Sequence, residues 1–330
     1  MKPVSILIVS WNTRQHLAAC LDSIRQSSPD CVEEVIVVDN DSADGSPEMV
    51  EQSYPEVILI RSGANFGFAK GNNLAMARAR GSQFALINSD ALVHPRCLET
   101  LSRYLTNHPD VGLVGPRVIG GDGLLQRSCR HLPGPWNTFC RALALDRLFG
   151  ARGIFSGYEV SPAQHESLRE AKVLSGCFCV ARRSAVEQIG GLDEQFFFYG
   201  EDIDWCRRFH KAGWKLVFIP EATATHFGGG STSKTPLRFS VEILKATLKY
   251  WRKHYGPIGQ ATCNALLVMH HGIRFLIRAL KNLVGLGRSP GSQAKLQEDV
   301  VCLRWLLLRI DVGDALTRAP SQDRPRHDAT

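Results

Sequence analysis

A chain of 330 residues, 44% hydrophobic and 22% charged, has an ordinary globular composition and room for one large domain or two. Its net charge of +7 is uneven, because the part from Leu237 onward holds 15 Lys/Arg and 7 Asp/Glu while the part before it is nearly neutral. This distribution argues against a nucleic-acid-binding core and indicates one basic surface.

The ten cysteines lie at irregular spacings and include no CxxC pair. This pattern excludes a disulfide framework and a zinc ribbon, so we expect reduced, buried cysteines in a cytoplasmic protein. The apolar start at residues 4–9 is too short for a signal-peptide core. No stretch reaches the roughly 18 apolar residues of a spanning helix.

Strands and helices alternate from residue 4 to residue 118. Short apolar runs predict the strands, and apolar residues at helical spacing predict the helices between them. The alternation indicates βαβ units and a mainly parallel sheet, whose ligands lie beyond the carboxyl ends of the strands. The predicted strands are 4–10, 35–38, 57–60, 84–87 and 111–118, and the helices begin after Thr13 and Ser46 and cover 68–79 and 95–107.

Two carboxylates follow predicted strands directly. Asp39 could accept hydrogen bonds from a nucleoside base or ribose, and Asp90 would lie at the rim of a crevice, where it could hold a divalent cation. Taken alone, each fits a solvated polar turn as well. A dinucleotide-binding oxidoreductase is excluded, because the turn from Ser10 to Thr13 contains no glycine where that fold needs G-x-G-x-x-G.

A turn rich in glycine and asparagine precedes the helix at 68–79. Glycines let a ligand approach the backbone closely, so Asn65, Gly67, Lys70 and Asn72 could serve a nucleotide. Residues 119–171 show no sustained period apart from a short strand within 124–131. Such a long irregular segment in a compact domain usually shapes a site.

Further strands are predicted at 173–181, 216–219 and 222–225. An aromatic run at 196–199 precedes Glu201 and Asp202 at the start of a helix. Acids at a helix N-terminus can serve as caps alone, but the aromatic run could also desolvate one of them and tune it as a base. His226 ends the last strand before a glycine-rich loop, where it would be open to a ligand.

The C-terminal third is predicted to be helical from 239 to about 285, with a break at Gly256, and again at 300–310. Basic residues such as Arg274 and Arg278 alternate with apolar ones, as in a helix that lies in a membrane interface. A helix packed on the domain or on a second subunit explains the same pattern equally well. We expect a catalytic domain over 1–236, a helical extension over 237–317 and a disordered tail over 318–330.

Five motifs taken together resemble the family 2 glycosyltransferases of GT-A fold, and within them the bacterial rhamnosyltransferase-like group. The resemblance spans residues 3–232. It implies a Rossmann-like α/β domain with a mainly parallel central sheet, followed here by a helical extension. The motifs are VVDNDSADGS (37–46), NFGFAKGN (65–72), INSD (87–90), GGLDEQFFFYGED (190–202) and HFGG (226–229).

The resemblance also implies roles for individual residues. Asp202 would be the catalytic base with Glu201 beside it, and Asp90 and His226 would hold Mg²⁺ or Mn²⁺. Asn88 stands where the fuller motif has its first Asp, so this metal site has one carboxylate fewer. The donor nucleotide would be bound by Asp39, Asn40, Asn65, Gly67, Lys70, Asn72 and Ser10.

The implied reaction is an inverting, metal-dependent sugar transfer from a dTDP- or UDP-sugar, with dTDP-L-rhamnose as the first expectation, to a saccharide or lipid-linked acceptor of the cell envelope. A nucleic-acid partner is not expected, whereas a homodimer and a peripheral contact with the inner face of the cell membrane are left open. The alternative is a GT-A domain without activity that binds glycans or scaffolds an assembly. The joint presence of Asp39, Asp90, Glu201 and Asp202 argues against this alternative.

Overall fold

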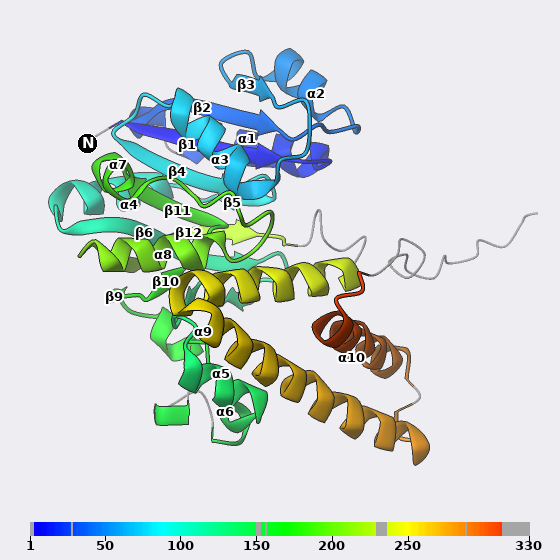
Figure 1. Ribbon diagram of the computed structural model, residues 1–330. Coiled ribbons are helices and arrows are strands. Elements are labelled where there is room, and N and C mark those ends of the chain that lie inside the picture. The colour runs from blue at the N-terminus through cyan, green and yellow to red at the C-terminus, as the bar shows by residue number, and fades with distance from the viewer. Residues whose placement is uncertain are drawn as a thin grey trace, which may run out of the picture.

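Four parallel strands form the first half of the central sheet in the computed structural model (Figure 1), which describes residues 3–27, 29–149, 153–155, 157–228, 236–287 and 289–311. Their order across the sheet is β3-β2-β1-β4, and most residues of β1 and β4 are buried. These strands and the helices between them are β1 (Val4–Ser10), α1 (Arg14–Ser27), β2 (Val32–Asp39), α2 (Ser46–Ser53), β3 (Ile58–Arg61), α3 (Gly67–Arg78) and β4 (Gln83–Asn88).

The second half of the sheet mixes directions. β11 (Phe178–Arg182) lies antiparallel between β4 and β6 (Val111–Gly120), β12 (Lys215–His226) runs parallel to β6, and β5 (Ala91–Val93) closes that edge. The predicted α/β fold with its mainly parallel sheet is therefore confirmed. The short strands outside this order are β7 (Leu125–Gln126), β8 (Cys129–Arg130), β9 (Arg169–Glu170) and β10 (Val173–Leu174).

The register of the parallel strands brings their polar ends together. Ser10 pairs with Asp39, and Val9 pairs with Asn88 on the other side of β1. The chain leaves β1 toward β2 and returns to its other side at β4, so a crevice forms beyond these strand ends, where α/β sheets bind ligands. The sheet thus positions the predicted site residues side by side.

Two hydrophobic cores cover the two faces of the sheet. Cys177 belongs to one and Cys179 to the other, because Cys177 lies in the turn before β11, where the side-chain alternation of the strand does not apply. All ten cysteines are buried and free, which agrees with the prediction of reduced, space-filling residues. The helices on the first face include α1, α2 and α4 (Cys97–Asn107), and those on the second include α3, α7 (Arg183–Ile189) and α8 (Glu201–Lys211).

The C-terminal helices form a third core. α9 (Pro236–Leu283) bends at Gly256, whose φ of 71° is not helical, and α10 (Pro290–Leu308) lies between its two arms (Figure 1). Trp305 is buried in this core, whereas Leu307 and Leu308 of the same predicted segment, 300–310, are exposed, so one side of the segment packs on the protein. Its membrane contact stays a prediction. No helix in the described ranges has the length and apolarity to span a bilayer. The domain boundary at residue 236 stays a prediction, and the predicted tail lies outside the described residues.

Three local predictions need correction. The helix after the second strand is capped by Gly45 in the left-handed conformation, not by Ser46. The strands predicted at 216–219 and 222–225 are one strand, β12, because a bulge between Ile219 and Thr223 carries it past Pro220. The single strand predicted at 173–181 is divided into β10 and β11 by a turn at 175–177.

Candidate active site

Asp39 lies buried at the end of β2, and one of its carboxylate oxygens has no hydrogen-bond partner among the described residues. Its Oδ2 accepts a hydrogen bond from the Ser42 backbone N–H at 2.9 Å, while Oδ1 has no partner in the described part of the chain. An unpaired buried acceptor is costly unless a ligand supplies a donor. A base N–H or a ribose hydroxyl would supply one.

Three further residues of the predicted site share this feature. Asn40 donates through Nδ2 to the Gly67 carbonyl at 3.0 Å, and Asn72 donates to the Phe68 carbonyl at 2.9 Å. Each of them leaves its side-chain oxygen buried and unpaired within the described residues, as does Glu201. Four predicted residues therefore present unused acceptors, a chemistry that suits a ligand rich in N–H and O–H donors.

The two glycines of the 65–72 turn are required for packing. Gly67 has a φ of 80°, and a Cβ there would lie 2.2 Å from the Phe197 carbonyl oxygen. That oxygen accepts from the Phe68 N–H at 3.2 Å, so the aromatic run closes on the turn. Gly71 lets α3 approach Val9 of β1. Their predicted role toward the donor stays a prediction.

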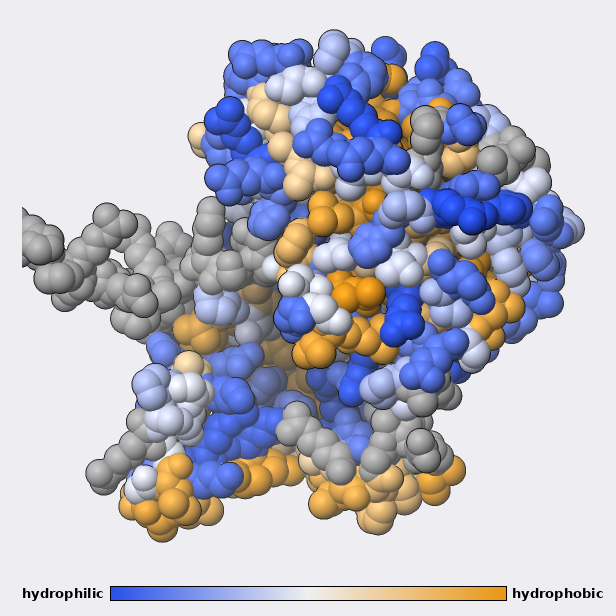
Figure 2. Space-filling model, turned by 180° about the vertical axis from the view of Figure 1, so that it is seen from behind, coloured by the Kyte–Doolittle hydropathy of each residue, from blue (hydrophilic) through white to orange (hydrophobic). Residues whose placement is uncertain are grey.

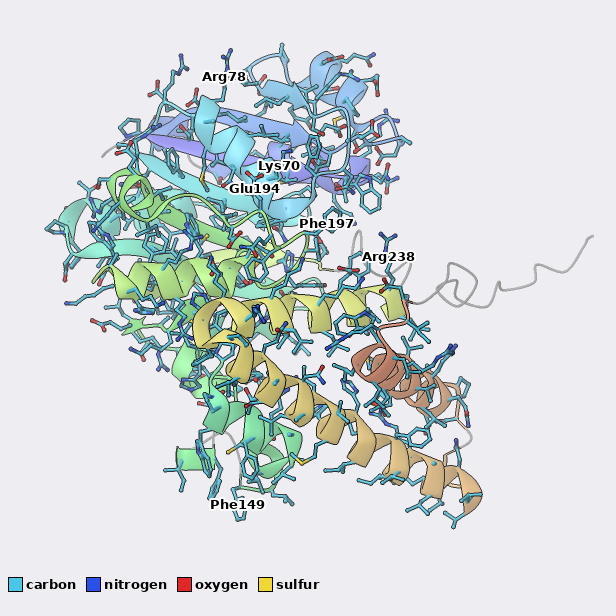
Figure 3. All side chains as sticks on the ribbon, viewed as in Figure 1. Lys70, Arg78, Phe149, Glu194, Phe197 and Arg238 are labelled. Atoms are coloured by element: carbon cyan, nitrogen blue, oxygen red, sulfur yellow. The ribbon has the colours of Figure 1, made fainter. Side chains whose placement is uncertain are left out.

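Asn65 and Lys70 flank the same turn. Asn65 Oδ1 accepts from the Gly67 N–H at 3.0 Å, and Lys70 Nζ lies 3.8 Å from the centre of the Phe66 ring. Figure 3 shows Lys70 and Phe197 on the same side of the sheet, at the aromatic loop. The lysine makes no ion pair with a described residue, so its charge is available to an anionic ligand.

A row of hydroxyl groups connects the ends of β1 and β4. Ser10 Oγ lies 3.0 Å from Thr13 Oγ1, which donates to Ser89 Oγ at 2.9 Å. All three residues are buried. Thr13 and Ser89 were not predicted as site residues, since they are separated in the sequence and only the parallel pairing of β1 with β4 brings them together.

Asp90 and His226 lie close together although they are far apart in the sequence, because β5, which follows Asp90 directly, pairs with the end of β12. His226 Nε2 lies 3.2 Å from Asp90 Oδ1 and 3.2 Å from Asn88 Nδ2. Burial would raise the pKa of Asp90, but the hydrogen bond and charge interaction with His226 outweigh it and hold the pKa below its ordinary value.

Gln126 determines which nitrogen of His226 carries the proton. Its Nε2 donates to the His226 carbonyl at 2.7 Å, so the amide orientation is settled and its Oε1 faces His226 Nδ1 at 2.9 Å. An amide oxygen only accepts, so Nδ1 carries the hydrogen and Nε2 is left facing Asp90. A proton or a cation between Nε2 and the carboxylate satisfies both.

Asp202 and Glu201 begin α8 but have different environments. Asp202 accepts backbone N–H bonds from Gly176 at 3.2 Å and from Ile203 at 2.8 Å. Glu201 is buried beside it, and this burial together with the negative charge of Asp202 raises the pKa of Glu201 to about 8. At neutral pH Glu201 is therefore mostly a carboxylic acid.

A cavity of about 850 Å³ brings the two sides of the site together. Asn88 and His226 line it together with Glu201 and Asp202. The nucleotide-side residues Asp39 and Asn40 lie outside its lining, at the neighbouring strand ends. The remaining walls come from the segment that shows no period in the sequence and from the C-terminal helices, and include Arg127, Arg130, Arg141, Tyr158, Tyr250 and His270.

Comparison with known proteins places this geometry in a family. The model of the family described as Glycosyl transferase family 2 matches residues 5–190. An N-acetylglucosaminyl-diphospho-decaprenol L-rhamnosyltransferase of Mycobacterium tuberculosis is 30% identical over 242 residues, which cover 70% of this chain and 78% of the relative. The low-salt glycan biosynthesis hexosyltransferase Agl10 of Haloferax volcanii is 24% identical over 62% of this chain and 61% of its own.

Solved structures share the fold. The mannosyltransferase PcManGT of Pyrobaculum calidifontis, in complex with GDP-Man and Mn²⁺, matches with a TM-score of 0.57 and 16% identity over 92% of this chain and 85% of that one. GalNAc-T7 with UDP, GalNAc and Mn²⁺ matches with a TM-score of 0.55 and 14% identity over 69% and 43%. The fold is thus the predicted GT-A type with a C-terminal helical region. The chain belongs to glycosyl transferase family 2 and is a glycosyltransferase.

Proposed function

We propose that the protein transfers a sugar from a nucleoside diphosphate donor to an acceptor hydroxyl with inversion at the anomeric carbon. The observation that carries this proposal is the shared cavity, in which Asp202 faces the same space as His226 and Asn88. A base and a candidate metal site on one cavity are what a direct displacement needs. The buried unpaired oxygens of Asp39 and Asn40 support a nucleotide on the adjoining strand ends.

In the proposed reaction Asp202 accepts the proton of the acceptor hydroxyl while the oxygen of that hydroxyl attacks the anomeric carbon. The bond from that carbon to the diphosphate oxygen breaks in the same step, so the sugar changes configuration once. A positioned base contributes roughly 10²–10⁴-fold in rate. Burial and the charge of Asp202 raise the pKa of Glu201 to about 8, so Glu201 is mostly protonated at neutral pH and Asp202 is the acid to which we assign this role first.

Asp90 and His226 fit a divalent cation. Adjacent ligands of an octahedral ion at roughly 2.1 Å lie about 3 Å apart, and the two donor atoms are 3.2 Å apart. No three His, Cys, Asp or Glu side chains of the described residues gather into a metal site, so the donor diphosphate and water would complete the ligands. A bound Mg²⁺ or Mn²⁺ would stabilise the negative charge on the leaving diphosphate. Asp90 would hold it through a carboxylate oxygen and His226 through Nε2.

The donor we propose first is dTDP-L-rhamnose, from which L-rhamnose would be transferred, because the relative from Mycobacterium tuberculosis is named an L-rhamnosyltransferase. The acceptor we propose is a saccharide, free or carried on a lipid diphosphate, in cell-envelope glycan synthesis. The name of the same relative and the size of the cavity support this acceptor class.

A donor screen tests the proposal. Purified protein would be incubated with Mn²⁺ and dTDP-L-rhamnose, UDP-sugars or GDP-mannose, and release of nucleoside diphosphate would be followed with and without saccharide acceptors. We expect metal-dependent release with one donor class. Binding of glycans without turnover of any donor would instead favour the inactive glycan-binding or scaffold alternative.

A further inference from the structure

Exposed apolar side chains form two tips at one end of the molecule. On α9 the side chains of Leu276, Leu280, Leu283 and Val284 are 60 to 81% exposed; we call them the α9 tip. Near the end of α6 (Leu145–Leu148), those of Leu148, Phe149 and Ile154 are 61 to 74% exposed and form the α6 tip. Single exposed apolar residues are ordinary, but clusters of this kind mark a binding surface.

The two tips lie at the same end of the molecule, both in the view of Figures 1 and 3 and in the opposite view of Figure 2. Figure 3 places Phe149 at the lower end, far from Lys70 and Phe197, and the end of α9 reaches the same level (Figure 1). From behind, Figure 2 shows apolar residues gathered at two places along this lower end, with a recessed surface between them. One broad surface could therefore contact both tips at once.

The α9 tip has the pattern of a helix lying on an apolar surface. Leu276, Leu280 and Leu283 recur at spacings of four and three residues, so they share one face of the helix. The opposite side of this arm packs on α10, where Arg278 pairs with the buried Asp299. The outward face is thus free of the fold's own packing.

Charge indicates what covers this face. Residues 258–287 contain Arg274, Arg278 and Lys281 but no Asp or Glu. Lys281 is exposed beside the leucines, and its long side chain can reach from an apolar surface to anionic groups. Leucines with a flanking lysine and no acid complement a bilayer with anionic headgroups. A rigid protein partner would have to match both tips and the recess between them.

The tips also have a fixed relation to the cavity. Thr138 and Arg141 of α5 (Pro135–Ala142), which leads into α6, line the cavity, and so do Leu267, His270 and His271 of α9. The elements that carry the two tips are therefore walls of the catalytic cavity. A surface that holds the tips would lie beside the acceptor side of the site.

We infer that the α9 and α6 tips form a docking surface for an anionic lipid bilayer, on which the protein lies without crossing it. The inference goes beyond the proposed reaction, since it concerns where the enzyme binds and not which sugar it transfers. Within the C-terminal third it assigns the predicted membrane contact to the α9 tip, and it adds the α6 tip, which lies outside that third.

Vesicle flotation of the full chain tests the inference. Phosphatidylcholine vesicles with and without phosphatidylglycerol would be compared at low and high salt. We expect binding that needs the anionic lipid and weakens with salt, because the attraction is screened. The double variants Leu280→Ser/Leu283→Ser and Phe149→Ser/Ile154→Ser should each lower the partition coefficient by roughly 100-fold or more, since each removes two large apolar side chains.

Ile258→Ser is the matched control, because Ile258 is 84% exposed on the same arm of α9 but roughly 35 Å along the helix from the tip. It should bind like wild type. Wild-type binding by both tip variants would overturn the inference. So would absence of vesicle binding combined with a dimer mass, by light scattering, that the tip variants lose, which would assign the surface to a second copy. Donor hydrolysis needs no membrane and should stay at the wild-type rate in all variants, which separates this test from that of the proposed function.

Discussion

Asp90 Oδ1 lies 3.2 Å from His226 Nε2, and Gln126 keeps the proton of that imidazole on the other nitrogen. Two electron-pair donors so close together need a positive charge between them. A divalent cation would provide it. The arrangement of Asp90 before β5, Gln126 on β7 and His226 on β12 thus supports a site that binds metal.

Gln126 is a positioning residue in this arrangement, so Gln126→Leu should lower the apparent affinity for Mn²⁺ by roughly 10–100-fold, as losses of such partners do at other metal sites. The kcat at saturating Mn²⁺ should recover most of its wild-type value, because Asp202 is untouched. Titration of activity with Mn²⁺ measures both quantities. Gln188→Leu, which removes an amide that binds Trp214 outside the cavity, is the control. An unchanged Mn²⁺ requirement in Gln126→Leu would contradict the assignment.

Asp39→Asn should weaken binding of the free nucleoside diphosphate by roughly tenfold or more, the range for a hydrogen bond to a charged group. The reason is geometric: Asn has one oxygen, and the Ser42 N–H already uses one carboxylate oxygen of Asp39. Isothermal titration calorimetry measures the change. The control is Asp41→Asn, which alters an exposed residue of the same turn. Asp41 has a left-handed backbone conformation that asparagine tolerates. This variant should bind the nucleoside diphosphate normally. Equal affinities for the two variants would remove Asp39 from the nucleotide site.

Asp204 joins α9 to the catalytic domain, since its carboxylate lies 2.7 Å from Lys253 Nζ, 2.7 Å from His254 Nε2 and 2.8 Å from Arg208 Nε. Asp204→Asn removes the carboxylate from this fully buried position, and of the three groups Lys253 keeps another carboxylate partner, Asp193. We expect the free energy of unfolding to fall by about 3 kcal/mol, the lower end for a broken buried pair. Urea denaturation measures it. Asp110→Asn breaks the half-exposed pair with Lys215 and should cost under about 1 kcal/mol. If the free energy of unfolding fell no more for Asp204→Asn than for Asp110→Asn, the ion pairs of Asp204 would not be what holds α9 on the rest of the protein.

Most of the proposed nucleotide-binding residues could be predicted from local sequence, because each of them directly follows the apolar residues that form its strand. Asp39, Asn88 and Asp90 could be placed at one sheet edge once four buried parallel strands were predicted. Prediction of the α/β fold succeeded for the same reason.

The acceptor side does not follow from the sequence in this way. Gln126 lies on a two-residue strand, too short to show a period, and it reaches His226 only because β7 pairs with β6 beside β12. The insertion of antiparallel β11 between β4 and β6 is likewise a matter of tertiary pairing. Gly67 was predicted to let a nucleotide approach, whereas the group observed against it is the Phe197 carbonyl.

Glu201 predicts a pH dependence of stability. Its folded-state pKa of about 8 lies above its ordinary value of 4.5, so its contribution is fully present below about pH 4.5 and is lost as the pH rises toward 8. Glu201→Gln stays neutral and lacks this loss. Across that window the melting temperature of wild type should therefore fall more steeply than that of the variant, by differential scanning fluorimetry. Parallel curves would mean that the carboxyl ionises in the folded protein as it does in water.

Asp202→Asn tests the catalytic base. The change keeps the size of the side chain and removes its basicity, so donor and Mn²⁺ binding should survive while kcat falls by roughly 10²–10⁴. Asp202 accepts hydrogen bonds from the backbone N–H groups of Gly176 and Ile203. In the variant one of these two N–H groups would face the NH₂ of the new amide. A melting curve of the variant should therefore accompany the kinetics.

The matched control for Asp202→Asn is Glu201→Gln, which imitates the protonated form that Glu201 already has at neutral pH. Its kcat should fall far less than that of Asp202→Asn. If Glu201→Gln proved the slower enzyme, the two acids would exchange roles, and the raised pKa would describe a base that works above neutral pH. If Asp202→Asn lost donor binding together with turnover, Asp202 would belong to the donor site. The proton of the acceptor would then have to leave through another group on the cavity wall, and His131 and Glu159 would be the first to test, since both line it.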